Sequence, residues 1–291
     1  MAILRTEELT YQYSAGTPFE KTAVDHVDLE RGEGAFVGVI GSTGSGKSTL
    51  MQHFNGLLRP TSGAVYLDGM DIWADKTKIR DVRFQVGLVF QYPEYQLFEE
   101  TVYRDIAYGP KNMGLTESEI KERVLETAEL VGLPEELLEQ SPFALSGGQK
   151  RRVAIAGVMA LRPRILILDE PTAGLDPMGR EDILGEIRAY HKKTGGTVLL
   201  VSHSMEDVAK CAEKILVMDH GKKFCYEDTA AVFRRAQELE TLGLSVPQVT
   251  RICMELRRRG LPLGDDIYTV QQAARQLAAL YQGRKGGASI C

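Results

Sequence analysis

The chain has 291 residues, of which 43% are hydrophobic and 26% are charged, an ordinary composition for a globular protein with one large domain and a smaller appendage. Its formal net charge of -5 disfavours a dedicated nucleic-acid-binding protein, because such proteins carry a basic face. No apolar run approaches the roughly 18 residues that a membrane-spanning helix needs, and the first residues do not resemble a signal peptide. We therefore expect any membrane role to depend on a partner protein.

Short apolar runs alternate with amphipathic stretches over about the first 225 residues. The runs 165–168 and 198–201 are apolar on both faces, which is typical of central parallel strands that helices cover on each side. We expect further strands at 35–40, 64–67, 86–90 and 215–218, and a turn at His220-Gly221 that leads into a strand at 222–226. The alternation predicts an α/β fold with a parallel-sheet core.

Helix ends are readable in several places. Thr116 and Glu119 have the spacing of a capping box, and Gly195 should end the helix before the run 198–201. After about residue 230 we expect a small helical domain (229–291) that follows a main domain (1–228). One of its helices aligns Val249, Ile252, Cys253 and Leu256, and a second, which begins after Thr269, aligns Val270, Ala274, Leu277 and Tyr281. We expect these faces to pack on each other or on the main domain, with a dimer contact as the alternative.

A glycine-rich segment at 41–48 fits the pattern G-x-x-x-x-G-K-[ST] and directly follows an apolar strand. Such a loop turns backbone N–H groups towards phosphate oxygens, and the helix behind it adds its positive end. Lys47 would reach the β- and γ-phosphates, and Ser48 would bind Mg²⁺. The predicted nucleotide-binding residues of this segment are Gly41, Ser42, Thr43, Gly44, Ser45, Gly46, Lys47, Ser48 and Thr49.

Two carboxylates, Asp169 and Glu170, end the apolar run 165–168. If this strand lies beside the glycine-rich loop, both carboxylates reach the phosphate site, Asp169 as a partner of Mg²⁺ and Glu170 as the base that polarises the attacking water. A second helix start that could bind an anion follows Leu145, at Ser146, Gly147, Gly148 and Gln149. One nucleotide needs a single phosphate cradle, so this second one makes sense if it serves a nucleotide held by another subunit.

In this order, segments 41–48, 146–149 and 165–170 resemble the Walker A, signature and Walker B motifs of ATP-binding cassette (ABC) ATPases. The resemblance covers residues 4–226 and implies a P-loop NTPase fold with antiparallel β elements and a helical signature subdomain at about 92–160. It also implies ATP and Mg²⁺ as cofactors. ATP would lie between the Walker A loop of one subunit and the signature segment of a second ABC ATPase subunit, in a head-to-tail dimer.

Four further residues take their roles from this resemblance alone. Gln91 matches the Q-loop glutamine that senses Mg²⁺ and the transport partner, and Asp176 matches the D-loop residue that crosses the dimer interface. His203 matches the switch histidine that contacts the γ-phosphate. Tyr13 matches the aromatic residue that stacks on adenine, with Tyr11 as an alternative. The catalytic residues that we predict are thus Glu170, His203, Gln91 and Lys47, and the Mg²⁺ ligands are Ser48, Gln91 and Asp169.

A narrower resemblance lies in segments 91–102, 109–112 and 151–157, which are similar to those of energy-coupling factor (ECF) transporter ATPases. Residues 43–45 and 93–95 resemble the second of the two paired ATPases, although Ser42 departs from the histidine expected there. The resemblance implies a peripheral protein on the cytoplasmic face of the membrane that powers uptake of a vitamin or a transition-metal ion. Its partners would be a second ATPase, a transmembrane coupling subunit and a substrate-binding membrane subunit.

Two other functions stay open at this stage. One is the ATPase subunit of an ABC transporter of another type, which would have a different membrane partner. The other is a soluble ABC protein that acts on ribosomes or chromosomes. Such proteins split the cassette with long coiled coils or carry two cassettes in one chain, whereas this sequence has one uninterrupted cassette without a heptad run.

Overall fold

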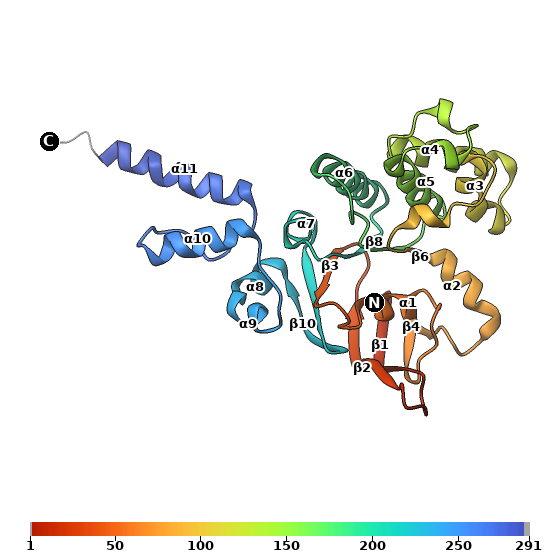
Figure 1. Ribbon diagram of the computed structural model, residues 1–291, viewed down its shortest axis with the longest axis horizontal. Coiled ribbons are helices and arrows are strands. Elements are labelled where there is room, and N and C mark those ends of the chain that lie inside the picture. The colour runs from red at the N-terminus through yellow and green to blue at the C-terminus, as the bar shows by residue number, and fades with distance from the viewer. Residues whose placement is uncertain (1, 288–291) are drawn as a thin grey trace.

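Two β-sheets lie at the centre of the molecule (Figure 1), and the computed structural model describes residues 2–287. The larger sheet has the order β10-β9-β3-β8-β7-β6, in which all strands are parallel except β10, which pairs antiparallel with β9. The smaller sheet is antiparallel, with the order β2-β1-β4-β5. The strands are β1 (Leu4–Tyr13), β2 (Lys21–Arg31), β3 (Phe36–Gly41), β4 (Ser62–Leu67), β5 (Met70–Asp71), β6 (Val86–Val89), β7 (Ile165–Asp169), β8 (Thr197–Val201), β9 (Lys214–Asp219) and β10 (Lys222–Asp228).

Helices cover the larger sheet and form two peripheral groups. The α-helices are α1 (Lys47–Phe54), α2 (Ile79–Gln85), α3 (Val102–Asn112), α4 (Glu117–Leu130), α5 (Gly147–Met159), α6 (Pro177–Thr194), α7 (Met205–Cys211), α8 (Thr229–Arg234), α9 (Ala236–Thr241), α10 (Gln248–Arg258) and α11 (Val270–Gly287). Four short 3₁₀ helices are η1 (Lys76–Lys78), η2 (Pro93–Gln96), η3 (Glu135–Leu137) and η4 (Pro142–Ala144). Among residues 2–287, no helix has both the length and the apolar character that crossing a membrane requires.

The predicted parallel-sheet core is confirmed, and every predicted strand is present within one or two residues of its expected bounds. All residues of β7 and β8 are buried, as their two-sided apolar pattern predicted. The predicted turn joins β9 to β10, with His220 and Gly221 both at positive φ, the conformation that tight hairpins need. The sequence analysis missed β1, β2 and β5. In β1 the pairing with β2 shifts register three times between Thr6 and Gln12, so its side chains do not show the simple alternation of a strand.

Each face of the larger sheet has its own hydrophobic core. Val37 and Val39 of β3 belong to the core shared with the antiparallel sheet and α1. Phe36 and Ile40, which alternate with them, belong to the core shared with α3–α9. Fully burying one such side chain stabilises a fold by about 1.5–3 kcal/mol. The loops at the ends of these strands are therefore held on a rigid base.

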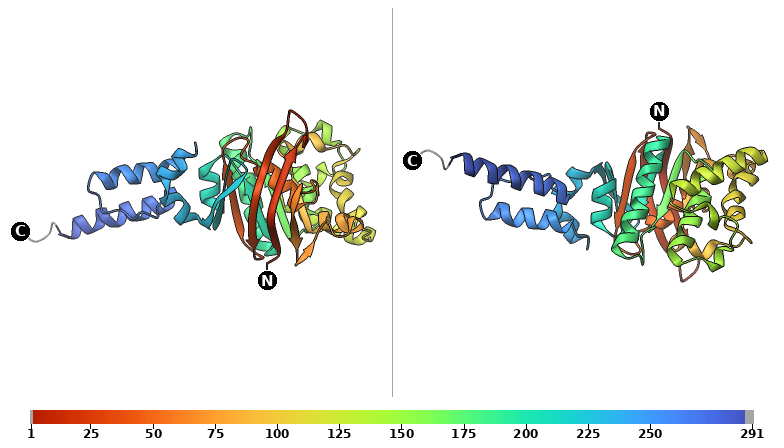
Figure 2. Two further views of the ribbon diagram at one scale, coloured as in Figure 1. Left: turned by 90° about the horizontal axis from the view of Figure 1, so that it is seen from below. Right: turned by 90° about the horizontal axis from the view of Figure 1, so that it is seen from above.

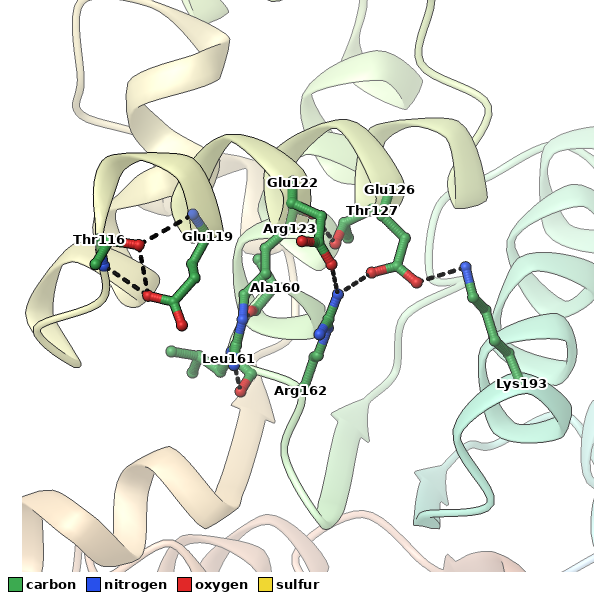
Figure 3. Close-up of polar contacts among 10 residues, drawn as sticks. All are labelled: Thr116, Glu119, Glu122, Arg123, Glu126, Thr127, Ala160, Leu161, Arg162 and Lys193. Atoms are coloured by element: carbon green, nitrogen blue, oxygen red, sulfur yellow. Dashed lines mark hydrogen bonds and ion pairs between the residues drawn. The ribbon is translucent and has the colours of Figure 1, made fainter.

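The helical subdomain, α3–α5, is joined to the sheet by polar contacts along α4 (Figure 3). Its predicted capping box is confirmed: Thr116 and Glu119 exchange side-chain and backbone hydrogen bonds of 2.8 and 3.4 Å. Arg123 donates to the carbonyls of Ala160 and Leu161 just after α5, at 3.1 and 3.0 Å. These bonds satisfy carbonyls that the end of a helix leaves without partners.

A second set of contacts reaches from α4 to α6. Arg162 pairs with Glu122 and Glu126, and Glu126 also lies 2.6 Å from Lys193 near the end of α6. Gly195, in the left-handed conformation, then ends α6 as predicted. Helix α4 is thus tied both to the segment that follows α5 and to α6.

The C-terminal helices α10 and α11 project from the end of the molecule opposite to α3–α5 (Figures 1 and 2). They share a small separate cluster whose buried members are Cys253, Leu263, Ile267 and Ala273. Helices α8 and α9 instead contribute Val232, Phe233, Ala236 and Leu239 to the main core. The predicted domain boundary at 228/229 therefore coincides with the end of the last strand, β10. The separate hydrophobic cluster of α10 and α11 begins only at Val249. The boundary itself remains a prediction.

One expectation about these helices is wrong. The stripe predicted to pack inward on α11 faces outward, with Val270 67%, Leu277 36% and Tyr281 62% exposed, and Ile252 of α10 is 58% exposed. Ala273 and Leu280 make the inward contact in its place. Since α11 carries apolar residues on two adjacent stripes, periodicity alone could not tell which of them is buried.

Candidate functional site

The candidate site is a cleft of about 240 Å³ at the carboxyl edge of the parallel strands. The loops after β3, β6, β7 and β8 all open at this edge, which is where open α/β sheets generally bind ligands. Strands β1 and β2 of the smaller sheet add one wall. The lining residues are Tyr13, Lys21, Ala23, Thr43, Gly44, Gly46, Lys47, Ser48, Thr49, Gln91, Asp169, Glu170, Val201 and His203.

The loop between β3 and α1 holds a buried lysine. Gly46 precedes α1 at φ 96°, and a Cβ there would lie 2.2 Å from the carbonyl oxygen of Ala23, so only glycine fits. Lys47 is 6% exposed, and its Nζ donates to the carbonyls of Gly41 and Ser42 at 2.8 and 2.9 Å. Burial lowers the pKa of Lys47, while the charges of Glu170 and Asp169 oppose this shift. The arrangement presents a cation and a helix N-terminus to one small space, which suits an anion such as a phosphate.

Three oxygen-bearing side chains lie together in this cleft, on Ser48, Gln91 and Asp169. Asp169 ends β7 and hydrogen-bonds Ser48; burial raises the pKa of Asp169, and this hydrogen bond opposes the increase. Hydroxyl, amide and carboxylate oxygens are the ligands that a hard cation such as Mg²⁺ accepts. In the part of the chain that the structure describes, no group of three or more His, Cys, Asp or Glu residues could hold a metal. The donor set therefore fits an ion that takes its remaining ligands from water and substrate phosphates, as Mg²⁺ does.

Glu170 combines burial with a free oxygen. It lies in the left-handed region at φ 51°, where its N–H donates to the carbonyl of Val201 at 3.0 Å. Burial raises the pKa of Glu170 to about 7; the charge of Asp169 adds to this increase and Lys47 opposes it. Its Oε1 is buried and has no hydrogen-bond partner among the described residues. A carboxylate with such a pKa and a free acceptor can take a proton from water near neutral pH.

His203 stands beside this carboxylate. Its Nε2 is 3.4 Å from Oε1 of Glu170, but the two groups are not aligned for a hydrogen bond. Burial lowers the pKa of His203, Lys47 adds to the decrease and Asp169 opposes it. The imidazole is therefore neutral at physiological pH and can donate one hydrogen bond into the cleft.

The structure separates the two tyrosines that the sequence left as alternatives. Tyr13 lines the cleft, is 40% exposed and lies 3.2 Å from the hydroxyl of Thr49. Tyr11 is packed against the core, and its ring centroid is 4.8 Å from that of His53. Tyr13 alone of the two offers an accessible ring face at the cleft, so it stays our prediction for the residue that stacks on a base.

Several predicted site residues lie elsewhere. Gly41, Ser42 and Ser45 belong to the loop but do not line the cleft. Ser146 and Gln149 form a capping box at the start of α5, with hydrogen bonds of 3.0 and 3.3 Å, and residues 146–148 are exposed. Asp176 caps α6 by accepting from the N–H of Gly179 at 2.7 Å and is also exposed. Within residues 2–287, none of positions 146–149 or 176 borders the cleft of its own chain.

The sequence analysis missed Lys21, Ala23 and Val201, which also line the cleft. Lys21 and Ala23 arrive on β2, whose position depends on how the two sheets pack together. No local motif marks them. Val201 could have been found, since it is the last residue of a predicted strand two positions before His203.

The chemistry of the cleft is that of an ATPase, and the comparison with known families agrees: the chain belongs to the ABC transporter family, whose model matches residues 24–173. Within that family, its relatives include the energy-coupling factor transporter ATP-binding protein EcfA2 of Caldanaerobacter subterraneus subsp. tengcongensis, which is 52% identical over 97% of this chain and 99% of the relative. The EcfA2 protein of Clostridium perfringens is 54% identical over 94% of this chain and 96% of the relative. The predicted ABC family and ECF type are thereby confirmed.

Solved structures agree with this assignment. The cbiO1 protein of Clostridium perfringens, described as part of the ABC transporter complex cbiONQ, has a TM-score of 0.73 and 38% identity, over 87% of this chain and 99% of that chain. The ATP-binding cassette MJ0796, solved as a dimer in a post-hydrolysis state with ADP and Pi, has a TM-score of 0.69 and 30% identity, over 78% of this chain and 98% of that chain. The chain is therefore an ATPase with the predicted P-loop ABC fold.

Proposed function

We propose that this chain hydrolyses ATP to drive an energy-coupling factor importer through a transmembrane coupling subunit. The observation that carries the proposal is Glu170, a buried carboxylate with a pKa of about 7 whose free Oε1 faces the cleft that also holds Lys47. The similarity to EcfA2 proteins over nearly the whole chain supports the transporter type.

The side chains divide the work of hydrolysis. Lys47 and the backbone of the glycine-rich loop bind the β- and γ-phosphates. Glu170 accepts a proton from the attacking water, and neutral His203 hydrogen-bonds the γ-phosphate. Ser48, Asp169 and Gln91 would hold Mg²⁺, which neutralises charge on the phosphates when it is bound. Tyr13 would stack on adenine at the rim.

The exposed signature residues support a composite site in a dimer. Ser146, Gly147 and Gly148 form an exposed helix start that does not border the nucleotide cleft of their own chain, so we propose that they complete the site of a second ABC ATPase subunit. Asp176, exposed at the start of α6, would cross the same interface. The outward apolar stripe of α11 offers a further contact between the two subunits.

A cluster of exposed aromatic side chains supports a membrane partner. Tyr95 is 84%, Phe98 58% and Tyr108 48% exposed, and all three lie on η2 and α3 or between them, just after Gln91. Exposed apolar patches of this kind mark interaction sites. We propose that the coupling subunit docks there, that a substrate-binding membrane subunit selects a vitamin or a transition-metal ion, and that this chain lies peripherally on the cytoplasmic face of the membrane.

Replacing Glu170 by Gln tests the proposal. The variant should bind ATP with ordinary affinity, and MgATP turnover of the complex purified with its membrane subunits should fall by about 10²–10⁴-fold, the usual contribution of a positioned base. Glu227→Gln, which makes the same change to an exposed carboxylate outside the cleft, is the matched control. Unchanged turnover in Glu170→Gln would reject Glu170 as the base.

A further inference from the structure

Arg151 is a buried cation in the signature helix α5 and forms a two-bonded ion pair with Glu94 of η2. Its Nε donates to Oε2 of Glu94 at 3.0 Å, and its Nη2 donates to Oε1 at 2.7 Å. The side chains are only 4% and 15% exposed. Burial raises the pKa of Glu94, but the hydrogen bonds and the charge of Arg151, together with a backbone hydrogen bond, lower that pKa overall. The pair thus joins the segment after Gln91 to the signature helix.

The same guanidinium reaches a third segment. Its Nη1 donates to the carbonyls of Pro171 and Ala173, at 3.3 and 2.6 Å. These residues directly follow Glu170, and the N–H of Ala173 donates back to the carbonyl of Glu170 at 3.1 Å. Arg151 therefore connects Glu94 to the turn 171–175. Glu170 lies just before this turn, and Asp176 lies just after it.

The ring of Tyr92 also lies near Arg151 and near the turn 171–175. Tyr92, held in the left-handed region at φ 55°, has its ring 6.0 Å from the guanidinium carbon of Arg151. A Cβ placed on Gly174 would lie 3.9 Å from the ring of Tyr92, in ordinary van der Waals contact. The residues after Gln91 thus reach the turn 171–175 through the ring of Tyr92 and through Arg151, which binds both Glu94 and the carbonyls of that turn.

We propose that Arg151 is a positioning residue that transmits displacement of segment 92–98 to the turn 171–175, and so to Glu170 and Asp176. The proposal rests on the proposed function, in which segment 92–98 meets the membrane partner. Arginine suits this task because its rigid fork can bind a carboxylate through two donors while a third donor binds carbonyls. Lysine, a single charged point on a flexible stem, cannot hold all these acceptors in one geometry.

Hydrogen exchange in the full-length chain tests the transmission directly. Among residues 2–287, Glu94 forms no hydrogen bond with residues 171–176, and the polar route from Glu94 to that turn runs through Arg151. Glu94→Gln should speed amide exchange about tenfold or more in 92–98 and also in 171–176, and Arg151→Lys should do the same in 171–176. Arg164→Lys is the matched control for Arg151→Lys, because Arg164 also binds one carboxylate, that of Glu33, through its Nε and Nη2, but at the exposed surface. An effect of Glu94→Gln confined to 92–98 would overturn the proposal.

Turnover of the complex purified with its membrane subunits supplies the second test. Arg151→Lys should lower kcat for MgATP by roughly 10–100-fold, the cost of misplacing a catalytic group by about 1 Å, with KM for ATP within about twofold. A merely structural role would instead lower the melting temperature and raise KM together. Turnover within twofold of wild type would overturn the proposal. Unchanged turnover in Glu170→Gln would reject Glu170 as the base, whereas loss in Glu170→Gln but not in Arg151→Lys would reject only the role of Arg151.

Discussion

His203 and Glu170 approach within 3.4 Å, through Nε2 and Oε1, without a hydrogen bond between them. The two side chains come from the ends of neighbouring strands, β8 and β7, whose parallel pairing sets Asp169 opposite Val201. A neutral imidazole and a carboxylate with a raised pKa therefore face one small volume, in which a water molecule and a terminal phosphate can meet.

The raised pKa of Glu170 predicts how activity depends on pH. Only the ionised carboxylate accepts a proton, so kcat/KM should rise as the pH increases through about 7, the pKa of Glu170, since kcat/KM reports the free enzyme. The measurement is kcat/KM for MgATP between pH 5.5 and 8.5. His203→Asn should keep this rising limb at a lower overall rate. A flat profile in the wild-type protein would contradict the assignment of the base.

Replacing Tyr13 and Tyr11 separately should distinguish base stacking from packing. Tyr13→Ala should raise KM for ATP about tenfold, because stacking on a base contributes roughly 1–3 kcal/mol, and should leave kcat and the melting temperature near their wild-type values. Tyr11→Ala should lower the melting temperature and leave KM unchanged, because its ring packs against His53 in the core. Steady-state kinetics and thermal unfolding check both variants, and a reversed outcome would assign stacking to Tyr11.

A charge at Tyr95 should prevent docking without affecting nucleotide binding. Tyr95 is 84% exposed and lies outside the cleft. Tyr95→Asp should therefore retain ATP affinity and lose membrane subunits during co-purification from native membranes. Met70→Asp is the control, since Met70 is 64% exposed on the small strand β5 at the far edge of the antiparallel sheet. Equal co-purification of the two variants would argue against the docking surface, and loss of ATP binding would place Tyr95 in the nucleotide site.

Glu186 on α6 should make stability depend on pH. Burial raises its pKa to about 7; Arg152, which lies 3.2 Å away, opposes this and Asp182 adds to it. The pKa of Glu186 in the folded protein lies above its ordinary value of 4.5, so folding favours the protonated carboxyl group. The stability of the protein should therefore fall as the pH rises from 4.5 to about 7. Glu186→Gln removes this penalty. Its melting temperature should exceed that of wild type by roughly 3 °C at pH 8, the effect of about 1 kcal/mol, and by less at pH 5.5.

The control for Glu186 is Asp182→Asn, which removes the more exposed partner of Arg152. It should change the melting temperature little at either pH, because a half-exposed ion pair contributes little. An equal effect of the two variants would show that repulsion between Asp182 and Glu186, rather than the burial of Glu186, sets the pH dependence.

Much of the fold could be predicted because its signals are local. The runs 165–168 and 198–201 are apolar without interruption, and Thr116 and Glu119 have the spacing of a cap. The strand β1 could not be recognised, since its register shifts destroy the alternation on which prediction depends. The inward face of α11 could not be chosen either, because both candidate stripes have helical spacing and only the position of α10 decides between them.

The functional site shows the same difference between residues with a local sequence signal and residues placed by tertiary packing. Lys47, Asp169 and Glu170 belong to segments with a strand next to them, so their convergence followed from strand order. Lys21 and Ala23 depend on the packing of one sheet on the other, which no short pattern encodes. The connection through Arg151 was also invisible, because it depends on a contact between Glu94 and a residue 57 positions away.

The four buried side chains between α10 and α11 have a consequence for the intact molecule. So small a cluster supplies too little apolar contact to keep an isolated pair of helices folded. The stability of the helix pair α10–α11 therefore depends on its contacts with other parts of the molecule. One of these contacts is the hydrogen bond that the N–H of Gln248 donates to Glu206 on α7. A terminal arm of this kind opens first when the protein is warmed, and a neighbour bound along its outer side delays that opening.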